Sequence, residues 1–561
     1  MTRQNQEELP VKSRLVQKLT AAVLLLFTAF FIQSCEDKAD YEISGSENVG
    51  QAYEEDVEDR DSVFGVKLLG GKEIEEAIEG RKKSASGNER IALFFNGNAV
   101  PCTKNRKIFY LTVEQGENIY DSGTLTAGEG YEVLTDRDFL PANLPVLISH
   151  GNTIMFYVIG ETDYSIVELT LTYLPIVTID FDDMSGPEFA AHRCDFAVYN
   201  SVERDTKKAL VESRAEINIR GGSSASLAKT GLKVALKNED GSINKQKLLG
   251  MRKDDDWILT AMYSDESKVR DMLSWDLWRK MDSEFPGVNG SAAPANQYVE
   301  VLMNGRYHGL FLLMERFDSK TLDLSIENGD ELFKTKTWEV PTSHELSRQN
   351  GRSTMCGALE KKFPKPEDNI DGSWSGITEY VKICYEYSGD EFKKSIENAA
   401  DIHNQLDYWL FNNITMAGDN TWKNAYYAYK NGKIYTLPWD LDITFGLSWS
   451  GDFETNYLYE EPWTAEHTYD FQCGRRLIKY YDGASEYLQN RFDQLIDDDI
   501  ASADALIRQA ETYWSLIHDS GAMSRELERW PKTSYVGDLD YLKSSIRRRI
   551  DWLEDYIDSL D

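Results

Sequence analysis

Hydrophobic and polar residues alternate in short runs over residues 62–173, and Gly, Asn and Asp separate the runs. Examples are RIALFFNG (90–97), KIFYLTVEQ (107–115) and TIMFYVIG (153–160). A period of two places alternate side chains on opposite faces of a strand. Several such strands with turn residues between them predict a small β-sandwich domain over 62–173. Its expected role is to space or present the next domain, because it shows no chemistry.

From residue 174 the pattern changes from strands to helices. INIRGG (217–222), GLKVALK (231–237) and QYVEVLMNG (297–305) have the composition of strands. Farther along, AADIHNQLDYWLFNNI (399–414) spaces its apolar residues at helical intervals. This order predicts an α+β domain of two lobes over 174–561. The last segment, 540–560, is expected to be an amphipathic helix with its arginines in solvent.

The first 34 residues have the pattern of an export signal. Basic residues precede an uncharged run from Leu19 to Ser34, and Cys35 follows. The run is shorter than the ~20 apolar residues that cross a bilayer. Ile32-Gln33-Ser34-Cys35 resembles a lipobox, so we expect a signal peptide over 1–34 and lipidation of Cys35, which would attach the protein to a membrane through its acyl chains. The alternative is an ordinary secretory signal.

An acidic tether, residues 35–61, follows the cysteine and contains EEDVEDRD from Glu54. This stretch resembles the surface-export signal of lipoproteins from Bacteroidetes-like bacteria. The resemblance implies an outer membrane lipoprotein at the cell surface. The alternative is a solvated, flexible tether that carries no export signal.

Composition limits the partners. The chain is 41% hydrophobic and 28% charged, as in a large globular protein. Its net charge of −34, from 61 basic and 95 acidic residues, would repel a phosphate backbone, so no nucleic acid partner is expected. The cysteines after the lipobox show no C-x-x-C spacing, which argues against zinc, and their pairing stays open. They are Cys102, Cys194, Cys356, Cys384 and Cys473.

Four separated motifs then occur in a fixed order. The first is IRGGSS (219–224) with the strand after it, and the second is residues 248–273, with W-x-L and D-x-S-x-x-R patterns. The third is 298–318, with Asn304-Gly305 at its turn, and the fourth is 417–446. Together they resemble the spore-coat-protein-H (CotH) kinase family over about 174–560. The resemblance implies an atypical protein kinase that uses ATP and phosphorylates Ser or Thr of exported proteins, or itself.

The fourth motif offers a catalytic loop. A kinase positions its substrates, neutralises phosphate charge and holds a base near the acceptor hydroxyl, and protein kinases carry base and metal ligand as D-x-x-x-x-N. Asp419 and Asn424 have that spacing, between a long predicted helix and the strand AYYAYK. We therefore expect Asp419 as the base and Asn424 as a metal ligand. Taken alone, the pair favours turn and cap residues over a catalytic pair.

Two further carboxylates follow the next strand. Asp440 and Asp442 in PWDLD would share a face of an extended chain and could reach one cation or two. Asp440 is the expected main ligand and Asp442 its helper, although the order could be reversed. Hard oxygen ligands predict Mg, or Mn, as the cofactor. A strand-end turn or a calcium site is the alternative.

A nucleotide needs further contacts. The first motif forms a glycine-containing loop before a strand, which could present backbone N–H groups and hydroxyls to phosphate, although it is not G-x-G-x-x-G. Lys229 is the preferred phosphate cation and Lys233 the second choice; each could instead be an exposed strand lysine. Glu315 ends the strand between the lobes, where main-chain groups would hold adenine. The residues expected in the phosphate loop are Arg220, Gly221, Gly222, Ser223 and Ser224.

Some features leave the activity open. Asp265 or Ser267 is expected to cap the helix that carries Arg270, which could also touch phosphate. His-Arg-Asp and Asp-Phe-Gly are absent, so the resemblance is to atypical kinases. The alternative function is a surface adhesin or ligand-binding lipoprotein on a kinase-like scaffold. A carbohydrate-associated lipoprotein is a third hypothesis, from Trp422, Trp439 and Trp449.

Overall fold

The computed structural model describes residues 60–84, 91–116, 119–140, 143–183, 190–203, 205, 207–447, 471–531 and 538–560. Cys35, the expected signal peptide and nearly all of the acidic tether lie outside these residues, as does Trp449. The chain from Asp56 to Asp561 forms one compact unit. None of the helices described in that unit combines the length and apolar character that crossing a bilayer requires.

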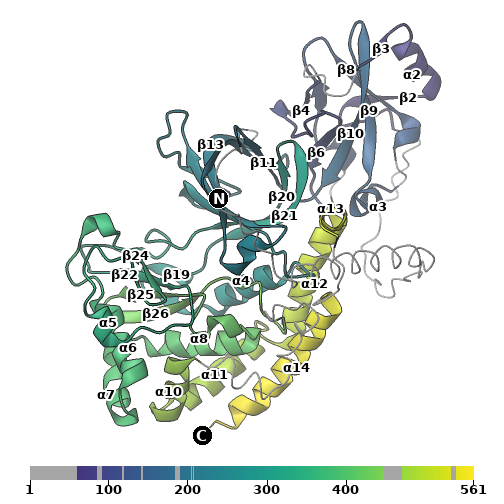
Figure 1. Ribbon diagram of the computed structural model, residues 1–561. Helices are drawn as coiled ribbons and strands as arrows, with labels where there is room; N and C mark the ends of the chain where they lie inside the picture. Colours follow the sequence, from purple (N-terminus) through teal and green to yellow (C-terminus); the bar gives the residue numbers. More distant parts are fainter. Residues whose placement is uncertain are drawn as a thin grey trace, which may run out of the picture. The chain divides into compact units, whose positions relative to one another are not determined.

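The N-terminal β-rich region contains two sheets around a common core (Figure 1). Phe109, Ile154 and Phe156 of the larger sheet are fully buried together with Leu93 and Leu125 of the smaller one. The larger sheet is mixed, because β2 pairs with β8, and β10 with β3 and β6, in parallel. The larger sheet consists of β1 (Ser62–Val63), β2 (Val66–Leu69), β8 (Glu132–Asp136), β9 (Thr153–Ile159), β10 (Asp163–Thr172), β3 (Lys82–Lys83) and β6 (Ile108–Thr112), and the smaller of β5 (Asn98–Ala99), β4 (Leu93–Phe95) and β7 (Leu125–Ala127).

Two short helices accompany these sheets, α2 (Gly71–Ile78) and α3 (Leu144–Ser149). The core of this region is continuous with the next part of the chain, since it also contains Ile176, Tyr199 and Leu302. The division at residue 173 remains a prediction.

A closed barrel comes next along the chain, built around its own apolar interior. Alternate residues of β14 point inward, so Leu232, Val234 and Leu236 are buried while Lys233 and Lys237 are partly exposed. Most neighbouring strands are antiparallel, but β11 and β20 pair in parallel and close the barrel. In order around the barrel the strands are β11 (Ile176–Phe181), β12 (His192–Tyr199), β13 (Leu210–Arg220), β14 (Gly231–Lys237), β17 (Asp256–Thr260), β21 (Arg306–Glu315) and β20 (Asn296–Met303).

The remaining sheet carries helices against it, and Figure 1 shows it beside α6 and α8. Mixed strands and helices thus give an α+β protein, as predicted. The sheet order is β23 (Met355–Cys356), β24 (Leu359–Phe363), β22 (Glu331–Thr335), β25 (Ala425–Lys430) and β26 (Lys433–Pro438), and the small ribbons are β15 (Gln246–Lys247) with β16 (Lys253–Asp254) and β18 (Glu284–Phe285) with β19 (Val288–Ser291).

Helix α8 (Ile402–Thr415) begins where Asp401 caps it by accepting a hydrogen bond from the Asn404 N–H. It ends at Met416, which adopts a left-handed conformation. Nearly all of α8 is buried, so its end holds the next loop rigidly. The other helices are α4 (Arg270–Met281), α5 (Ser343–Leu346), α6 (Ser375–Val381), α7 (Gly389–Ala399), α10 (Gln472–Tyr480), α11 (Ala484–Asp497), α12 (Ala503–Asp519), α13 (Ala522–Arg529) and α14 (Leu539–Asp558).

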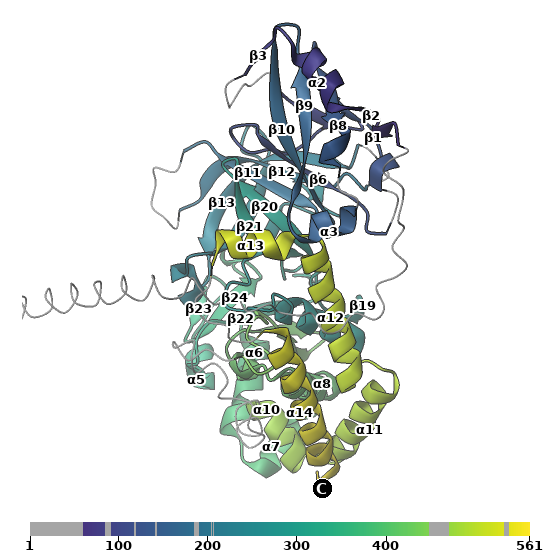
Figure 2. The same ribbon diagram turned by 90° about the vertical axis from the view of Figure 1, so that its right-hand side faces the viewer.

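Helix α14 confirms the predicted C-terminal helix, with Leu542, Ile546, Ile550 and Leu553 buried on one face. The expectation that its arginines face solvent is wrong for Arg549. The Arg549 guanidinium is buried and donates to the backbone oxygen and Oδ1 of Asn413 on α8, at 2.6 and 2.7 Å. Figure 2 shows α14 and α12 along the same side of the unit, where they pack together.

Candidate active site

The expected catalytic loop lies where the sequence placed it. Asp419 belongs to η7 (Gly418–Thr421), a 3₁₀ helix of one turn that follows α8 and precedes β25. Its Oδ2 accepts hydrogen bonds from Lys423 Nζ at 2.9 Å and from Asn424 Nδ2 at 3.5 Å. The Asp419 carboxylate therefore has a cation beside it and shares its environment with the predicted metal ligand.

Asn420, between these residues, ties the loop to the turn after β26. Its side chain is buried and its Nδ2 donates to the backbone oxygens of Asn424 and Trp439, both at 3.0 Å. Trp439 immediately precedes Asp440. One amide thus fixes the spacing between the Asp419 loop and the Asp440–Asp442 turn.

The turn is not extended through Asp440, in contrast to the sequence expectation. Asp440 has a φ of +62°, in the left-handed region, so Asp440 and Asp442 do not lie on one face of a strand. Asp440 is exposed, and Asp442 is less so. Asparagine and aspartate tolerate this conformation better than most residues. The Asp440 carboxylate therefore lies nearer the protein surface than the Asp442 carboxylate.

Acidic side chains converge around Asp442. Burial raises the pKa of Asp442 well above its ordinary value, and nearby negative charges raise it further. Asp271, in the first turn of α4, is fully buried and its pKa is raised to about 7 by burial and then by the charge of Asp440. Oδ1 of Asp271 has no hydrogen-bond partner within the described residues. The neighbours that raise the pKa of Asp442 are Asp440, Asp271, Asp265 and Asp419.

Two cations face these acids. The Arg220 guanidinium, at the end of β13, lies 5.4 Å from the centre of the Trp439 ring, and Lys334 Nζ, on β22, lies 4.9 Å from the same ring. Burial and the Arg220 charge lower the pKa of Lys334 to about 7, while Asp440 opposes that effect. Sequence reasoning missed both Lys334 and Asp271. A lysine in an otherwise buried strand, ELFKT, was the available signal for Lys334.

The loop after Arg220 is exposed and turns sharply. Gly221 has a φ of +124°, which residues with a side chain rarely adopt, and a Cβ there would lie 2.3 Å from Ser224 Oγ. Gly222, Ser223 and Ser224 are exposed at the start of the 3₁₀ turn η4 (Ser223–Ser226). This expected phosphate loop therefore begins beside the acidic cluster, at Arg220.

The expected lysines lie elsewhere. Lys229 is fully buried; its Nζ pairs with Glu526 of α13 at 2.6 Å, donates to the Leu310 carbonyl at 2.5 Å and lies 4.4 Å from the Phe311 ring centre. Lys233 is partly exposed on the outer face of the barrel, with Nζ 3.5 Å from Asp256. Neither has a described contact with the acidic cluster.

The Glu315 carboxylate accepts hydrogen bonds from main-chain N–H groups. Oε1 accepts from the Arg252 N–H at 2.8 Å and Oε2 from the Ala295 N–H at 3.3 Å. The Glu315 N–H itself donates to the Ala295 carbonyl at 2.9 Å. The side chain thus joins two loops to the end of β21.

Asp265 supports the start of α4, although the N-cap residue is Val269 and not Asp265 or Ser267 as expected. It accepts from the Ser267 hydroxyl at 2.7 Å and from the Arg270 N–H at 2.9 Å. The Arg270 side chain is fully buried, pairs with Asp265 at 2.5 Å and donates to the Thr444 carbonyl at 3.0 Å. Arg270 therefore joins the start of α4 to Thr444, two residues after Asp442.

The tryptophans behave as core residues. Trp422 and Trp439 are 4% and 2% exposed and contact other aromatic rings. Their burial leaves little ring surface for a sugar. The carbohydrate hypothesis therefore gains no support from these two positions.

Comparison with known proteins assigns the class. The model of the CotH kinase protein family matches residues 217–559, more than half of the chain, so this protein belongs to that family. The chain is similar to inner spore coat protein H of Bacillus subtilis (strain 168), with 24% identity over 199 residues, or 35% of this chain and 51% of the relative. It thus spans about half the length of the curated relative it matches.

Proposed function

We propose that the protein is an atypical kinase that transfers the γ-phosphate of ATP to Ser or Thr of exported proteins, or to itself, with Mg (or Mn). We also propose that it acts as an outer membrane lipoprotein at the cell surface, anchored through Cys35. The observation that carries the kinase proposal is the convergence of Asp419, Asn424 and the Asp440–Asp442 turn with two cations, Arg220 and Lys334.

The donor set suits magnesium. Asn424, Asp440 and Asp442 offer hard oxygens, and Asp271 adds a buried carboxylate oxygen without a hydrogen-bond partner in the described part of the chain. No group of three His, Cys, Asp or Glu in that part is arranged to hold a metal by itself. Mg²⁺ usually takes one or two carboxylates and completes its shell with water and phosphate oxygens, so a bound nucleotide would supply the rest. There the metal would neutralise phosphate charge.

In the proposed transfer, the acceptor oxygen attacks the γ-phosphorus and the bond to the ADP oxygen breaks, while the hydroxyl proton passes to Asp419. Lys423 Nζ, 2.9 Å from Asp419 Oδ2, would add positive charge beside the transferred group. Arg220 and Lys334 would contact the remaining phosphates, below the exposed loop from Gly221 to Ser224. Lys229, Lys233 and Glu315 stay predictions as nucleotide-binding residues.

Thermal shift with Mg–ATP tests the proposal. A nucleotide at 100 times its Kd should stabilise the native state by about 2.7 kcal/mol. Asp440→Ala should abolish the Mg-dependent part of the shift without unfolding the protein, because Asp440 is exposed. The matched control is Asp497→Ala, at an exposed aspartate on α11. No shift with any nucleotide and metal would refute the proposal and favour the adhesin.

A further inference from the structure

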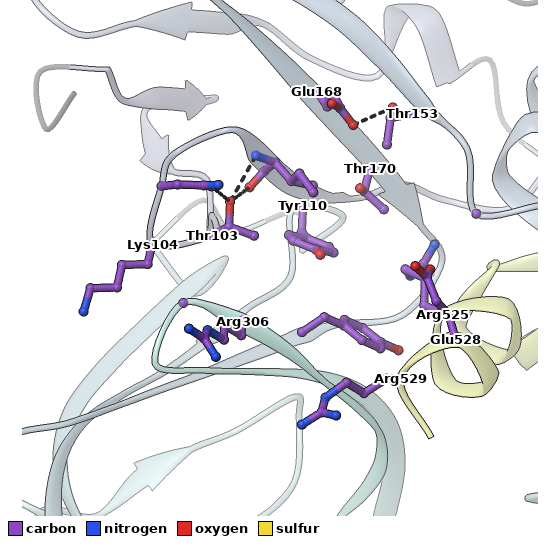
Figure 3. A pocket seen from close by; sticks show the side chains of 15 residues that line it. Thr103, Lys104, Tyr110, Thr153, Glu168, Thr170, Arg306, Arg525, Glu528 and Arg529 are labelled. Carbon is purple, nitrogen blue, oxygen red and sulfur yellow. Dashed lines mark hydrogen bonds between the residues drawn. The ribbon is translucent and has the colours of Figure 1, made fainter. Parts of the chain in front are cut away.

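A cavity of about 750 Å³ lies apart from the candidate active site. The loop and strand around Thr103–Tyr110, strands β9 and β10, the β20–β21 turn and helix α13 form its walls (Figure 3). Cavities of roughly 300–1,000 Å³ are typical of small-molecule sites. The volume is therefore suitable for a molecule of one or two sugar rings.

The walls are fixed in place. The Lys104 N–H donates to the Gly305 carbonyl at 2.8 Å, which joins the N-terminal region to the β20–β21 turn. Gly305 has a φ of +63°, and a Cβ there would lie 2.5 Å from the Lys104 nitrogen. Tyr110 and Tyr307 stack with ring centres 6.3 Å apart at 14°. The cavity is thus a preformed feature of the fold.

A buried guanidinium in the wall has spare hydrogen-bonding capacity. Arg525 is 8% exposed, and its Nε and Nη2 donate to the two carboxylate oxygens of Glu300 at 2.8 and 2.7 Å. Its Nη1 is buried and has no partner among the described residues. Buried polar groups without a partner are rare in folded proteins, but this atom has almost no accessible surface, so Arg525 shapes the wall and contributes no direct ligand contact in this conformation.

The rest of the lining contains cations, hydroxyl groups and the carboxylates of Glu168 and Glu528, of which Glu528 is exposed and precedes Arg529 on α13. Lys104, Arg306 and Arg529 are exposed cations at the rim, and Figure 3 shows Arg306 and Arg529 on the same side of the cavity. Such a group is notable in a chain of net charge −34. Across from them lie Thr153 and Glu168, joined by a 3.3 Å hydrogen bond. Carboxylate and threonine oxygens are the acceptors that sugar hydroxyls require.

We propose that this cavity binds a hexose that carries a phosphate or a carboxylate. The anionic group lies against Arg306 and Arg529, and the ring hydroxyls lie against Glu168 and the threonines. A neutral sugar would form no charged hydrogen bonds with the cations, and a simple anion would leave the hydroxyl acceptors unused. This proposal does not depend on the proposed kinase function.

Calorimetric titration of the full chain with glucose 6-phosphate and with glucuronate tests it. Glucose and inorganic phosphate are the comparison probes. At least one of the two anionic hexoses should bind the parent, and at least tenfold more tightly than either comparison probe. Arg306→Gln should weaken that binding by about tenfold or more, since it removes a charged hydrogen bond at an exposed position. Arg348→Gln, at an exposed arginine outside the cavity, is the matched control and should bind like the parent.

The site and the ligand class are tested separately. Arg220→Gln should bind the anionic hexose as the parent does, which separates the cavity from the candidate active site. Failure of both anionic hexoses to bind overturns the proposal. So does equal binding of glucose or inorganic phosphate, or an Arg306→Gln variant with unchanged affinity.

Discussion

The buried pair between Lys229 and Glu526 gives the sharpest test of the barrel's design. Both side chains are almost fully buried, and Lys268 Nζ lies 3.8 Å from the same Glu526 carboxylate. Glu526 also accepts the Leu310 N–H at 2.8 Å. Glu526→Gln removes the negative charge that serves both lysines. We expect it to lower the free energy of unfolding by about 3–5 kcal/mol, the usual cost of breaking a buried pair.

Lys229→Met should cost less, because Glu526 keeps Lys268 and the Leu310 N–H as partners. The double variant should be more stable than the sum of the two single effects predicts, since it leaves no charge of the pair uncompensated. Glu528→Gln is the matched control, two residues farther along α13 and exposed. Urea denaturation, followed by tryptophan fluorescence, measures the parent and all four variants.

A Glu526→Gln midpoint equal to that of Glu528→Gln would refute the reasoning. Mg–ATP affinity of the folded variants decides what else Lys229 does. If Lys229 contacts phosphate as the sequence suggested, Lys229→Met loses affinity while Glu526→Gln keeps it. If its role is structural, folded protein of either variant binds nucleotide like the parent.

Three further predictions concern other parts of the chain. Asp419→Asn should keep ATP affinity while single-turnover phosphoryl transfer falls by about 10²- to 10⁴-fold, whereas Asn424→Ala should weaken Mg–ATP binding as well; equal transfer by Asp419→Asn and parent contradicts the assignment. Burial lowers the pKa of His308 to about 4, so as pH falls from 6.5 to 4 the unfolded state gains a proton that the folded state does not, and the free energy of unfolding falls by about 3 kcal/mol. His308→Phe should reduce the change of the urea midpoint with pH over that range, and a pH dependence equal to that of the parent counts against the prediction. Cys35→Ser should leave the protein soluble or unprocessed in membrane fractionation, and lipid on that variant would disprove the lipobox.

The helices were predictable because their signals are local. α8 has a capping aspartate at its start and a 3.6-residue apolar period, and both features fix it within the sequence itself. The same local logic could have corrected the prediction for Arg549. It follows Ile546 by three residues and precedes Leu553 by four, so the helical period places it on the buried face.

The site was only partly predictable because its charges come from distant segments. The D-x-x-x-x-N spacing identified Asp419 and Asn424 from one loop. Lys334 joins the site only because β22 pairs with β25, which lies about ninety residues later in the chain, so no local pattern could predict its place. Asp271 reads in sequence as an ordinary first-turn acid of a helix. The left-handed backbone at Asp440 likewise depends on the packing of the turn, so no period of two could have revealed it.

Helix α13 explains why two buried ion pairs occur on neighbouring residues. Arg525 forks onto Glu300 of β20, and Glu526 bonds Lys229 and the Leu310 N–H of β21. Consecutive helical residues point about 100° apart, so one helix engages both strands of the hairpin. Apolar contacts alone would tolerate a helix shifted by one turn. Such a shift here would leave several buried charges unpaired at once, each at a cost of several kcal/mol. We infer that the two pairs fix the register of α13 on the barrel. They thereby also fix the α13 residues that line the cavity of about 750 Å³.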